Sequence, residues 1–183
     1  PGAALRVRDM STAMAREDWS RLIFDKLAAA GVTLFSYVPD FGNAALVEMA
    51  EEDNRTTAVL LSSEQEGVAL CAGADLVGGR GVLLMQSSGV GNVPNMLSLV
   101  QLGRFPMLMI VTMRGDYGEQ NPWQYPMGQA VVPVLEAMGI RCIRIERDDE
   151  LEQATDSAIS AAFAAGQGVA LILTQKFLGA KAF

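Results

Sequence analysis

Several residue types that carry enzyme chemistry are scarce or absent in this sequence. The 183 residues include no histidine, which removes the commonest general base and the commonest transition-metal ligand. The two cysteines, Cys71 and Cys142, lie far apart in apolar runs, so we interpret them as reduced core residues of a cytoplasmic protein. Ser-His and Cys-His nucleophiles are excluded, and no G-x-S-x-G turn occurs. A cofactor or a second chain must therefore supply most of any chemistry.

Positive charge and long apolar runs are also scarce. Lys and Arg total 14 against 21 acidic residues, a formal charge of −7, and the basic residues form no cluster, which argues against a nucleic-acid partner. No apolar run reaches the eighteen or so residues of a membrane span, and the first residues contain no signal-peptide core. We predict a cytoplasmic domain over residues 17–183, with residues 1–16 as an extension and Met10 or Met14 as candidate starts.

Hydrophobic residues, by contrast, are abundant and regularly placed. They make up 50% of the sequence, which suits a sheet covered on both faces or a large subunit interface. Short Val, Ile, Leu and Met runs, typical of buried strands, alternate with helical patterns. We expect strands at 32–39, 57–62, 81–86, 105–113, 140–145 and 169–175, and helices at 18–30, 42–53, 64–77, 92–102, 128–138 and 149–165. This alternation predicts an α/β fold: a doubly wound, mostly parallel six-stranded sheet with helices on both faces.

Polar residues gather in the loops that follow these strands. Ligands of doubly wound sheets bind outside the carboxyl ends of the strands, which here are the loops at 39–43, 62–66, 87–92 and 114–125. The second of these loops carries Glu64 and Glu66 at the start of an apolar helix, where acidic side chains also act simply as helix caps. Asp40, directly after Pro39, has the same capping interpretation.

Two other loops leave two interpretations each. The segment MQSSGVGNVPN has a G-x-G, but Pro94 occupies the place of the third glycine of a dinucleotide fingerprint, and no Walker lysine follows. It fits either a tight turn or the close approach of a flat ligand to bare backbone. The loop at 114–125 fits either a lid over an anionic substrate, with Arg114 as its cation, or a plain surface loop.

Three segments together resemble a known family. They are E-x-E-G-x-x-x-C-A-G from Glu64, M-Q-x-S-G-x-G-N from Met85, and R-G-D-x-G-E from Arg114 with P-M-G from Pro126. These motifs resemble the pyrimidine-binding domain of thiamine-diphosphate-dependent 2-oxoacid decarboxylases, and the chain is most similar to the sulfopyruvate and phosphonopyruvate decarboxylase group. The resemblance extends from about Trp19 to Phe177.

The resemblance implies a cofactor and a set of site residues. In the family, one glutamate hydrogen-bonds N1′ of the aminopyrimidine of thiamine diphosphate and lies nine residues before a helix glycine. Glu64 stands in that relation to Gly73, so it is the implied catalytic residue, and Glu66 is left as a cap. The glutamate promotes removal of the thiazolium C2 proton, after which addition to a 2-oxoacid releases carbon dioxide and then an aldehyde. The implied cofactor contacts are Pro39, Glu64, Gln86, Ser87, Ser88, Gly89, Val90 and Asn92, and the implied substrate contacts are Asp40, Arg114 and Gln124.

One family feature has no counterpart in these residues. The G-D-G segment and paired asparagines that hold magnesium and the diphosphate are missing, and no metal ligand is predicted in this chain. The resemblance therefore implies a beta subunit that carries the diphosphate-binding domain and Mg²⁺, with the active site between chains of an even-numbered hetero-oligomer. The implied substrate is a small anionic 2-oxoacid such as sulfopyruvate or phosphonopyruvate.

Three alternatives to this function stay open. Trp123 and Tyr125 in the 114–125 loop favour a bulkier or aromatic 2-oxoacid with the same cofactor. A non-catalytic regulatory subunit would keep the fold without the reaction. An unrelated doubly wound domain that binds a nucleotide is the third, and the broken glycine fingerprint weakens it.

Overall fold

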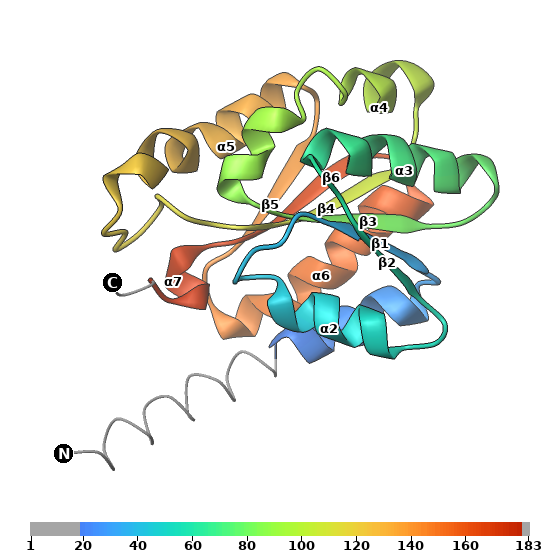
Figure 1. Ribbon diagram of the computed structural model, residues 1–183, viewed down its shortest axis with the longest axis horizontal. Helices are drawn as coiled ribbons and strands as arrows, with labels where there is room; N and C mark the ends of the chain where they lie inside the picture. Colours follow the sequence, from blue (N-terminus) through green and yellow to red (C-terminus); the bar gives the residue numbers. More distant parts are fainter. Residues whose placement is uncertain (1–18, 181–183) are drawn as a thin grey trace, which may run out of the picture.

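The computed structural model describes residues 19–180, so the predicted extension 1–16 and the helix start at Asp18 lie outside the described residues. The protein is a six-stranded sheet between two layers of helices (Figure 1). Its spatial strand order is β2-β1-β3-β4-β6-β5, and every pairing is parallel. The predicted fold class is confirmed. The strands are β1 (Leu34–Tyr37), β2 (Thr57–Leu60), β3 (Gly81–Gln86), β4 (Met107–Thr112), β5 (Arg141–Ile145) and β6 (Gly168–Leu173).

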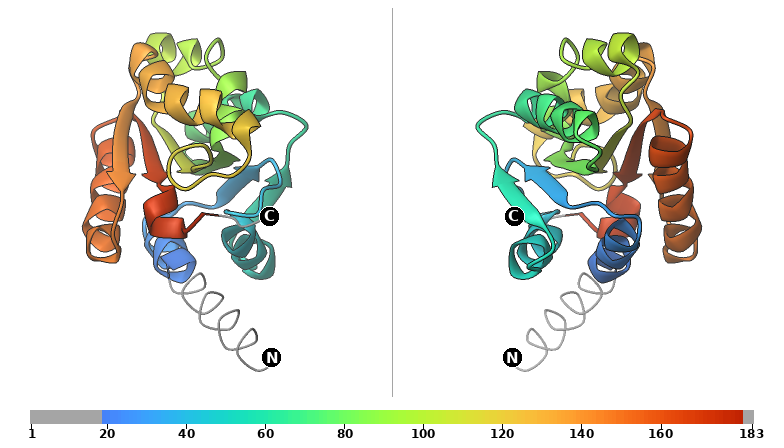
Figure 2. Two further views of the ribbon diagram at one scale, coloured as in Figure 1. Left: turned by 90° about the vertical axis from the view of Figure 1, so that its left-hand side faces the viewer. Right: turned by 90° about the vertical axis from the view of Figure 1, so that its right-hand side faces the viewer.

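The helices divide between the two faces of the sheet, as Figure 2 shows from both sides. One layer contains the described part of the first helix (residues 19–29), α2 (Ala44–Glu52), α6 (Leu151–Ile159) and α7 (Gln175–Leu178). The other layer contains α3 (Glu64–Leu76), α4 (Ser98–Gly103) and α5 (Tyr125–Ala137). Among residues 19–180, no helix has the length and apolar character needed to span a membrane.

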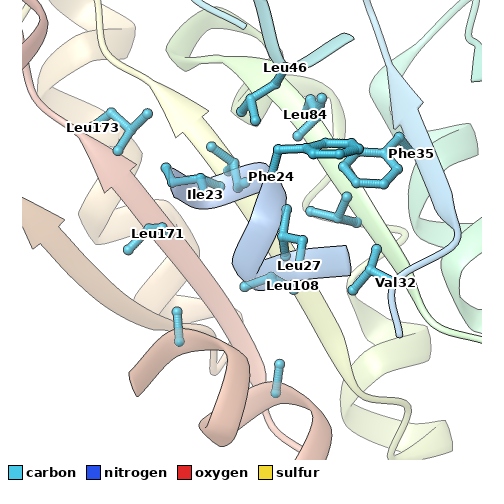
Figure 3. Close-up of a cluster of buried hydrophobic side chains, with 14 of the residues drawn as sticks. Ile23, Phe24, Leu27, Val32, Phe35, Leu46, Leu84, Leu108, Leu171 and Leu173 are labelled. Atoms are coloured by element: carbon cyan, nitrogen blue, oxygen red, sulfur yellow. The ribbon is translucent and has the colours of Figure 1, made fainter. Parts of the chain in front are cut away.

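The central strands supply both cores because their residues are apolar on both faces. All six residues of β4 and all six of β6 are buried. Successive side chains of a strand point to opposite faces, so Leu108 and Ile110 enter the core beneath the first helix, while Met109 and Val111 enter the other core. Figure 3 shows the first of these cores, where the Phe24 and Phe35 rings stack with centroids 5.6 Å apart.

Some element boundaries differ from the predicted ones. The expected helix at 92–102 is wrong in its first half: a 3₁₀ helix, η1 (Ser87–Asn92), comes first, and α4 starts only at Ser98. Pro94 has no N–H for a helical hydrogen bond, which explains the late start. Pro126 lies in the first turn of α5, which begins at Tyr125 and thus earlier than predicted. The remaining short elements are η2 (Pro122–Gln124), η3 (Asp148–Glu150) and the π-helical η4 (Ser160–Ala164), which continues α6.

The direction in which the chain winds reverses between β1 and β3. The chain leaves β1 through α2 toward β2, and it leaves β3 through α4 toward β4, on the opposite face of the sheet. The loops after these two neighbouring strands therefore diverge, which is the topological switch point where doubly wound sheets bind ligands. Both loops were among the four selected from the sequence.

Candidate functional site

Glu64 begins α3 and lies against the loop that follows β3. It is only 7% exposed, and its Oε2 accepts a hydrogen bond of 2.7 Å from Asn92 Nδ2. Gly89 packs directly on the same carboxylate, because a Cβ added at this glycine would clash with Glu64 Oε1. The loops at 62–66 and 87–92 thus meet at the Glu64 carboxylate. Three predicted site residues, Glu64, Gly89 and Asn92, lie together there.

The Glu64 carboxylate has few partners for a buried acid. Within residues 19–180 it forms no ion pair, and the amide of Asn92 is its one hydrogen-bond donor. A buried carboxylate without a counter-charge is costly unless a further donor reaches it. The arrangement leaves Oε1 able to accept a hydrogen bond from a bound group.

Glu66, two residues further on, has a different environment. It is exposed, and its carboxylate accepts from the Ser62 hydroxyl at 2.7 Å and from the Ser62 backbone N–H at 3.0 Å. The hydrogen bond from the Ser62 hydroxyl lowers the pKa of the Glu66 carboxyl. Glu66 therefore caps α3, as its sequence position suggested.

The loop after β3 uses most of its side chains for structure. Ser87 Oγ donates to the Arg114 carbonyl at 3.1 Å and accepts from the Arg114 N–H at 3.0 Å, which ties β3 to β4. Ser88 Oγ donates to Gln86 Oε1 at 3.0 Å. Val90 is fully buried in the core beneath α3 and α5. A ligand at this loop would therefore meet mainly backbone.

Asp40 holds the turn between β1 and α2. One of its carboxylate oxygens accepts from the N–H groups of Gly42 and Asn43 at 2.6 and 3.0 Å and from the Thr112 hydroxyl at 3.1 Å. The other accepts from Asn43 Nδ2 at 2.8 Å. Asp40 thus closes the turn before α2, whose N-cap residue is Asn43, and it does not itself cap the helix; Pro39 before it is exposed, just beyond the end of β1. Sequence reasoning missed Asn43, a buried amide whose Oδ1 has no partner within the described residues.

A small pocket opens beside Asp40, at the carboxyl ends of β1, β3 and β4. Its volume is about 60 Å³, and it lies on the side of the sheet that carries the first helix, α2 and α7. Three predicted residues, Asp40, Gln86 and Arg114, line it together with Trp19, Phe41, Gly42, Thr112, Met113, Leu178 and Gly179. Glu64, Asn92 and Gln124 do not line this pocket. The predicted residues at this edge of the sheet therefore include two groups. Glu64, Gly89 and Asn92 form one of them, and Asp40, Gln86 and Arg114 line the pocket.

Arg114 is held by a buried glutamate that sequence reasoning did not single out. Its Nε and Nη2 atoms donate to Glu119 at 2.5 and 2.8 Å, and the Glu119 side chain is fully buried. Gln175 Nε2 donates to the same carboxylate at 2.9 Å. The Arg114 guanidinium holds the pKa of the Glu119 carboxyl well below its usual range. This network fixes the first half of the loop at 114–125.

The glycines of the R-G-D and P-M-G motifs let this loop pack against α5. A Cβ at Gly115, whose φ is +71°, would clash with the Gln124 carbonyl, and one at Gly128 would clash with the Arg114 carbonyl. The Tyr125 hydroxyl closes the turn by donating to the Glu119 carbonyl at 2.6 Å. Gln124 is half-buried there, and its Oε1 has no hydrogen-bond partner among residues 19–180.

The sequence matches a family model over residues 18–129: thiamine pyrophosphate enzyme, N-terminal TPP binding domain. The chain belongs to this family. The predicted family and fold class are thereby confirmed, and the described site occupies the switch point of a thiamine pyrophosphate enzyme domain.

Relatives of known name agree with this membership. Sulfopyruvate decarboxylase subunit alpha of Methanocaldococcus jannaschii is 31% identical over 154 residues, which are 84% of this chain and 91% of the relative. The subunit of the same name from Methanothermobacter thermautotrophicus is 36% identical over 124 residues, or 67% of this chain and 75% of the relative. Phosphonopyruvate decarboxylase of Streptomyces viridochromogenes is 34% identical over 131 residues, which cover 70% of this chain and 33% of that protein.

A solved structure shares the fold at low sequence identity. It is the 2-oxoglutarate:ferredoxin oxidoreductase from Magnetococcus marinus, with a TM-score of 0.65 and 13% identity. The similarity covers 87% of this chain but only 29% of that one. At this identity the comparison shows the fold alone, which is that of one domain within a longer enzyme chain.

Proposed function

We propose that this chain is the alpha subunit of a thiamine-diphosphate-dependent decarboxylase of a small anionic 2-oxoacid, sulfopyruvate or phosphonopyruvate. The names of its relatives support this substrate class. The observation that carries the proposal is the buried Glu64 carboxylate, which has a single amide donor and no cation beside it within residues 19–180.

The residues around Glu64 fit the aminopyrimidine ring of the cofactor. Asn92 fixes one carboxylate oxygen, so the other is oriented to accept a hydrogen bond from N1′. Gly89 has no Cβ, and the Glu64 carboxylate packs into the space that a Cβ would fill, so the loop after β3 holds this carboxylate in place. When bound, thiamine diphosphate supplies a thiazolium carbon that adds to the 2-oxo group and accepts the electrons left by carbon dioxide. Through its hydrogen bond to the aminopyrimidine, Glu64 would promote removal of the C2 proton of the thiazolium.

The pocket beside Asp40 is the proposed place for the acidic end of the substrate. Arg114 lines it, and guanidinium groups bind sulfonate and phosphonate through charge-assisted hydrogen bonds. Glu119 acts as a positioning residue, because its two hydrogen bonds fix the guanidinium plane. Asp40 and Gln124 remain predicted substrate contacts. The small volume of the pocket favours a short 2-oxoacid over an aromatic one, and Trp123, which is 85% exposed, does not line it.

A beta subunit completes the proposed enzyme. It would carry the diphosphate-binding domain and hold Mg²⁺, and the relatives' name, subunit alpha, supports such a division. The outer faces of α3 and α4 expose several leucines, as expected of a surface that packs against other subunits. These are Leu70, Leu76, Leu99 and Leu102. An even-numbered hetero-oligomer in the cytoplasm remains our prediction.

The proposal is tested with this chain, a candidate beta subunit, Mg²⁺ and thiamine diphosphate. Carbon dioxide release is measured from sulfopyruvate, phosphonopyruvate and phenylpyruvate, with the native chain, Glu64→Gln and the matched variant Glu66→Gln. We expect activity that needs both chains, prefers one of the two anionic acids and falls about 10²- to 10⁴-fold in Glu64→Gln. Glu66→Gln should retain the native rate. A stable complex that releases carbon dioxide from none of the three acids would favour a regulatory subunit.

A further inference from the structure

A larger hollow lies at the opposite, amino-terminal edge of the sheet. Its volume is about 450 Å³, and the turns that lead into β4, β5 and β6 form its walls. Four of its lining residues have polar side chains: Gln101, Arg104, Arg141 and Gln167. Two of its glycines, Gly139 and Gly166, have φ near +70°. The Gln101 amide covers Gly139, whereas Gly166 leaves bare backbone. None of these residues belongs to the site at the carboxyl edge.

The two arginines of this hollow have no partner in the described protein. Arg104 and Arg141 are both exposed, and neither forms an ion pair or a side-chain hydrogen bond with any of residues 19–180. Most other described cations are paired with carboxylates, as expected in a chain of net charge −7. These are Lys26, Arg55, Arg114, Arg144, Arg147 and Lys176. Two unpaired guanidinium groups on one hollow therefore stand out.

Helix ends explain these arginines only in part. α4 ends at Gly103 and α5 at Ala137, and the partial negative charge of a helix C-terminus attracts cations. A capping role would have the guanidinium donate to the free carbonyls, which neither arginine does. Arg104 is moreover the one non-glycine residue of the described chain with positive φ, at 56°. Glycine is the usual residue at this helix-terminal position, so the position retains a cation at the expense of backbone strain.

We propose that this hollow binds a small molecule through a phosphate or sulfonate group. Arg104 and Arg141 would supply the charge-assisted, fork-shaped donors that such groups prefer. The amides of Gln101 and Gln167 offer further donors at the rim, although Gln101 Nε2 already donates to the Gly139 carbonyl at 3.2 Å. The site is separated from Glu64 by the length of the strands. The inference stands independently of the proposed decarboxylase activity.

Isothermal titration of the full chain tests the site, with inorganic phosphate and methanesulfonate as separate probes at constant ionic strength. We expect saturable binding that weakens about tenfold or more in Arg141→Gln and in Arg104→Gly. The glycine variant also relieves the positive φ, so its loss of binding cannot be ascribed to misfolding. The matched control is Arg21→Gln, which removes the same charge from an exposed residue of the first helix and should bind as the native chain does.

The probes and the control separate the possible results. Tighter binding of phosphate or of methanesulfonate identifies the preferred group. The absence of saturable binding of either probe up to about 10 mM would overturn the proposal. Equal weakening in Arg21→Gln would overturn it as well, because overall charge rather than this hollow would then control binding.

Discussion

Replacing Glu119 with glutamine removes the charge at the centre of the most buried ion pair described here. The carboxylate accepts from Arg114 at 2.5 and 2.8 Å and from Gln175 Nε2 at 2.9 Å. The backbone N–H groups of Gly115, Gln120 and Asn121 also donate to it, at 3.3, 3.0 and 2.9 Å. An amide of the same shape places an NH₂ group among these donors and leaves the guanidinium without its counter-charge.

The expected cost follows from the burial of the two partners. Breaking a buried ion pair costs about 3–5 kcal/mol, and the Arg114 side chain, 16% exposed, recovers some hydration. We therefore expect Glu119→Gln to lose about 3 kcal/mol of unfolding free energy, a fall in Tm of roughly 6–12 °C for a domain of this size. Circular dichroism during thermal and urea unfolding measures both. Glu66→Gln, which changes only an exposed cap, should cost much less than Glu119→Gln.

The same pair sets a pH dependence of stability. Arg114 lowers the pKa of Glu119 in the folded chain, so the unfolded chain takes up this proton first as the pH falls. The stabilisation is therefore complete above the unfolded pKa of about 4.3 and is lost progressively below it. The difference in stability between the native chain and Glu119→Gln should be constant near neutral pH and shrink below about pH 4. A difference that stays the same down to pH 3, or a variant as stable as the native chain, would refute this reasoning.

Other predictions concern the packing of the site and the cysteines. Gly89→Ala should displace the Glu64 carboxylate and lower carbon dioxide release by the assembled enzyme about tenfold or more. Gly73→Ala, whose added Cβ meets no atom within 4 Å, should instead raise the unfolding free energy of the isolated chain by about 0.5–1 kcal/mol; a loss of stability would contradict its open environment. Burial raises the pKa of Cys71 to about 12 and that of Cys142 to about 11. Neither thiol should react quickly with a thiol reagent at pH 8 until denaturant is added, and Cys71, which is buried, should be slower than the half-buried Cys142. Rapid labelling of the folded chain at Cys71, located by peptide mass mapping, would contradict its burial.

The order of strands and helices was predictable because the signal is local. The run of β6 is apolar throughout and that of β4 is apolar up to its last residue, Thr112, as expected of a sheet covered on both faces. Because the sheet is parallel, the same pattern predicts that the loops after the strands lie at one edge of the sheet. The start of α4 was predicted wrongly because the apolar spacing after Asn92 resembles a helix, while Pro94 and the nearby glycines favour a 3₁₀ turn. In this segment the turn preference of proline and glycine outweighs the helical spacing of the apolar residues, so α4 begins only at Ser98.

The arrangement within the site depends on contacts between distant residues. Glu64 and Asn92 are 28 residues apart, and only the packing of α3 against the loop after β3 brings them together. Glu119 and Gln175 are 56 residues apart, so neither motif spacing nor burial pattern indicates their network. The division of the predicted residues between the Glu64 cluster and the pocket beside Asp40 likewise arises from helices on opposite faces of the sheet.

The most direct test of the central claim is the exchange of the C2 proton of thiamine diphosphate for solvent deuterium. It is measured by rapid quenching and proton NMR on the complex of this chain with its beta subunit and Mg²⁺, without substrate. If Glu64 promotes removal of this proton, exchange should be at least about 10²-fold slower in Glu64→Gln than in the native complex, with Glu66→Gln unchanged. Equal exchange rates in the Glu64→Gln and native complexes, with the cofactor bound in both, would contradict the role proposed for Glu64.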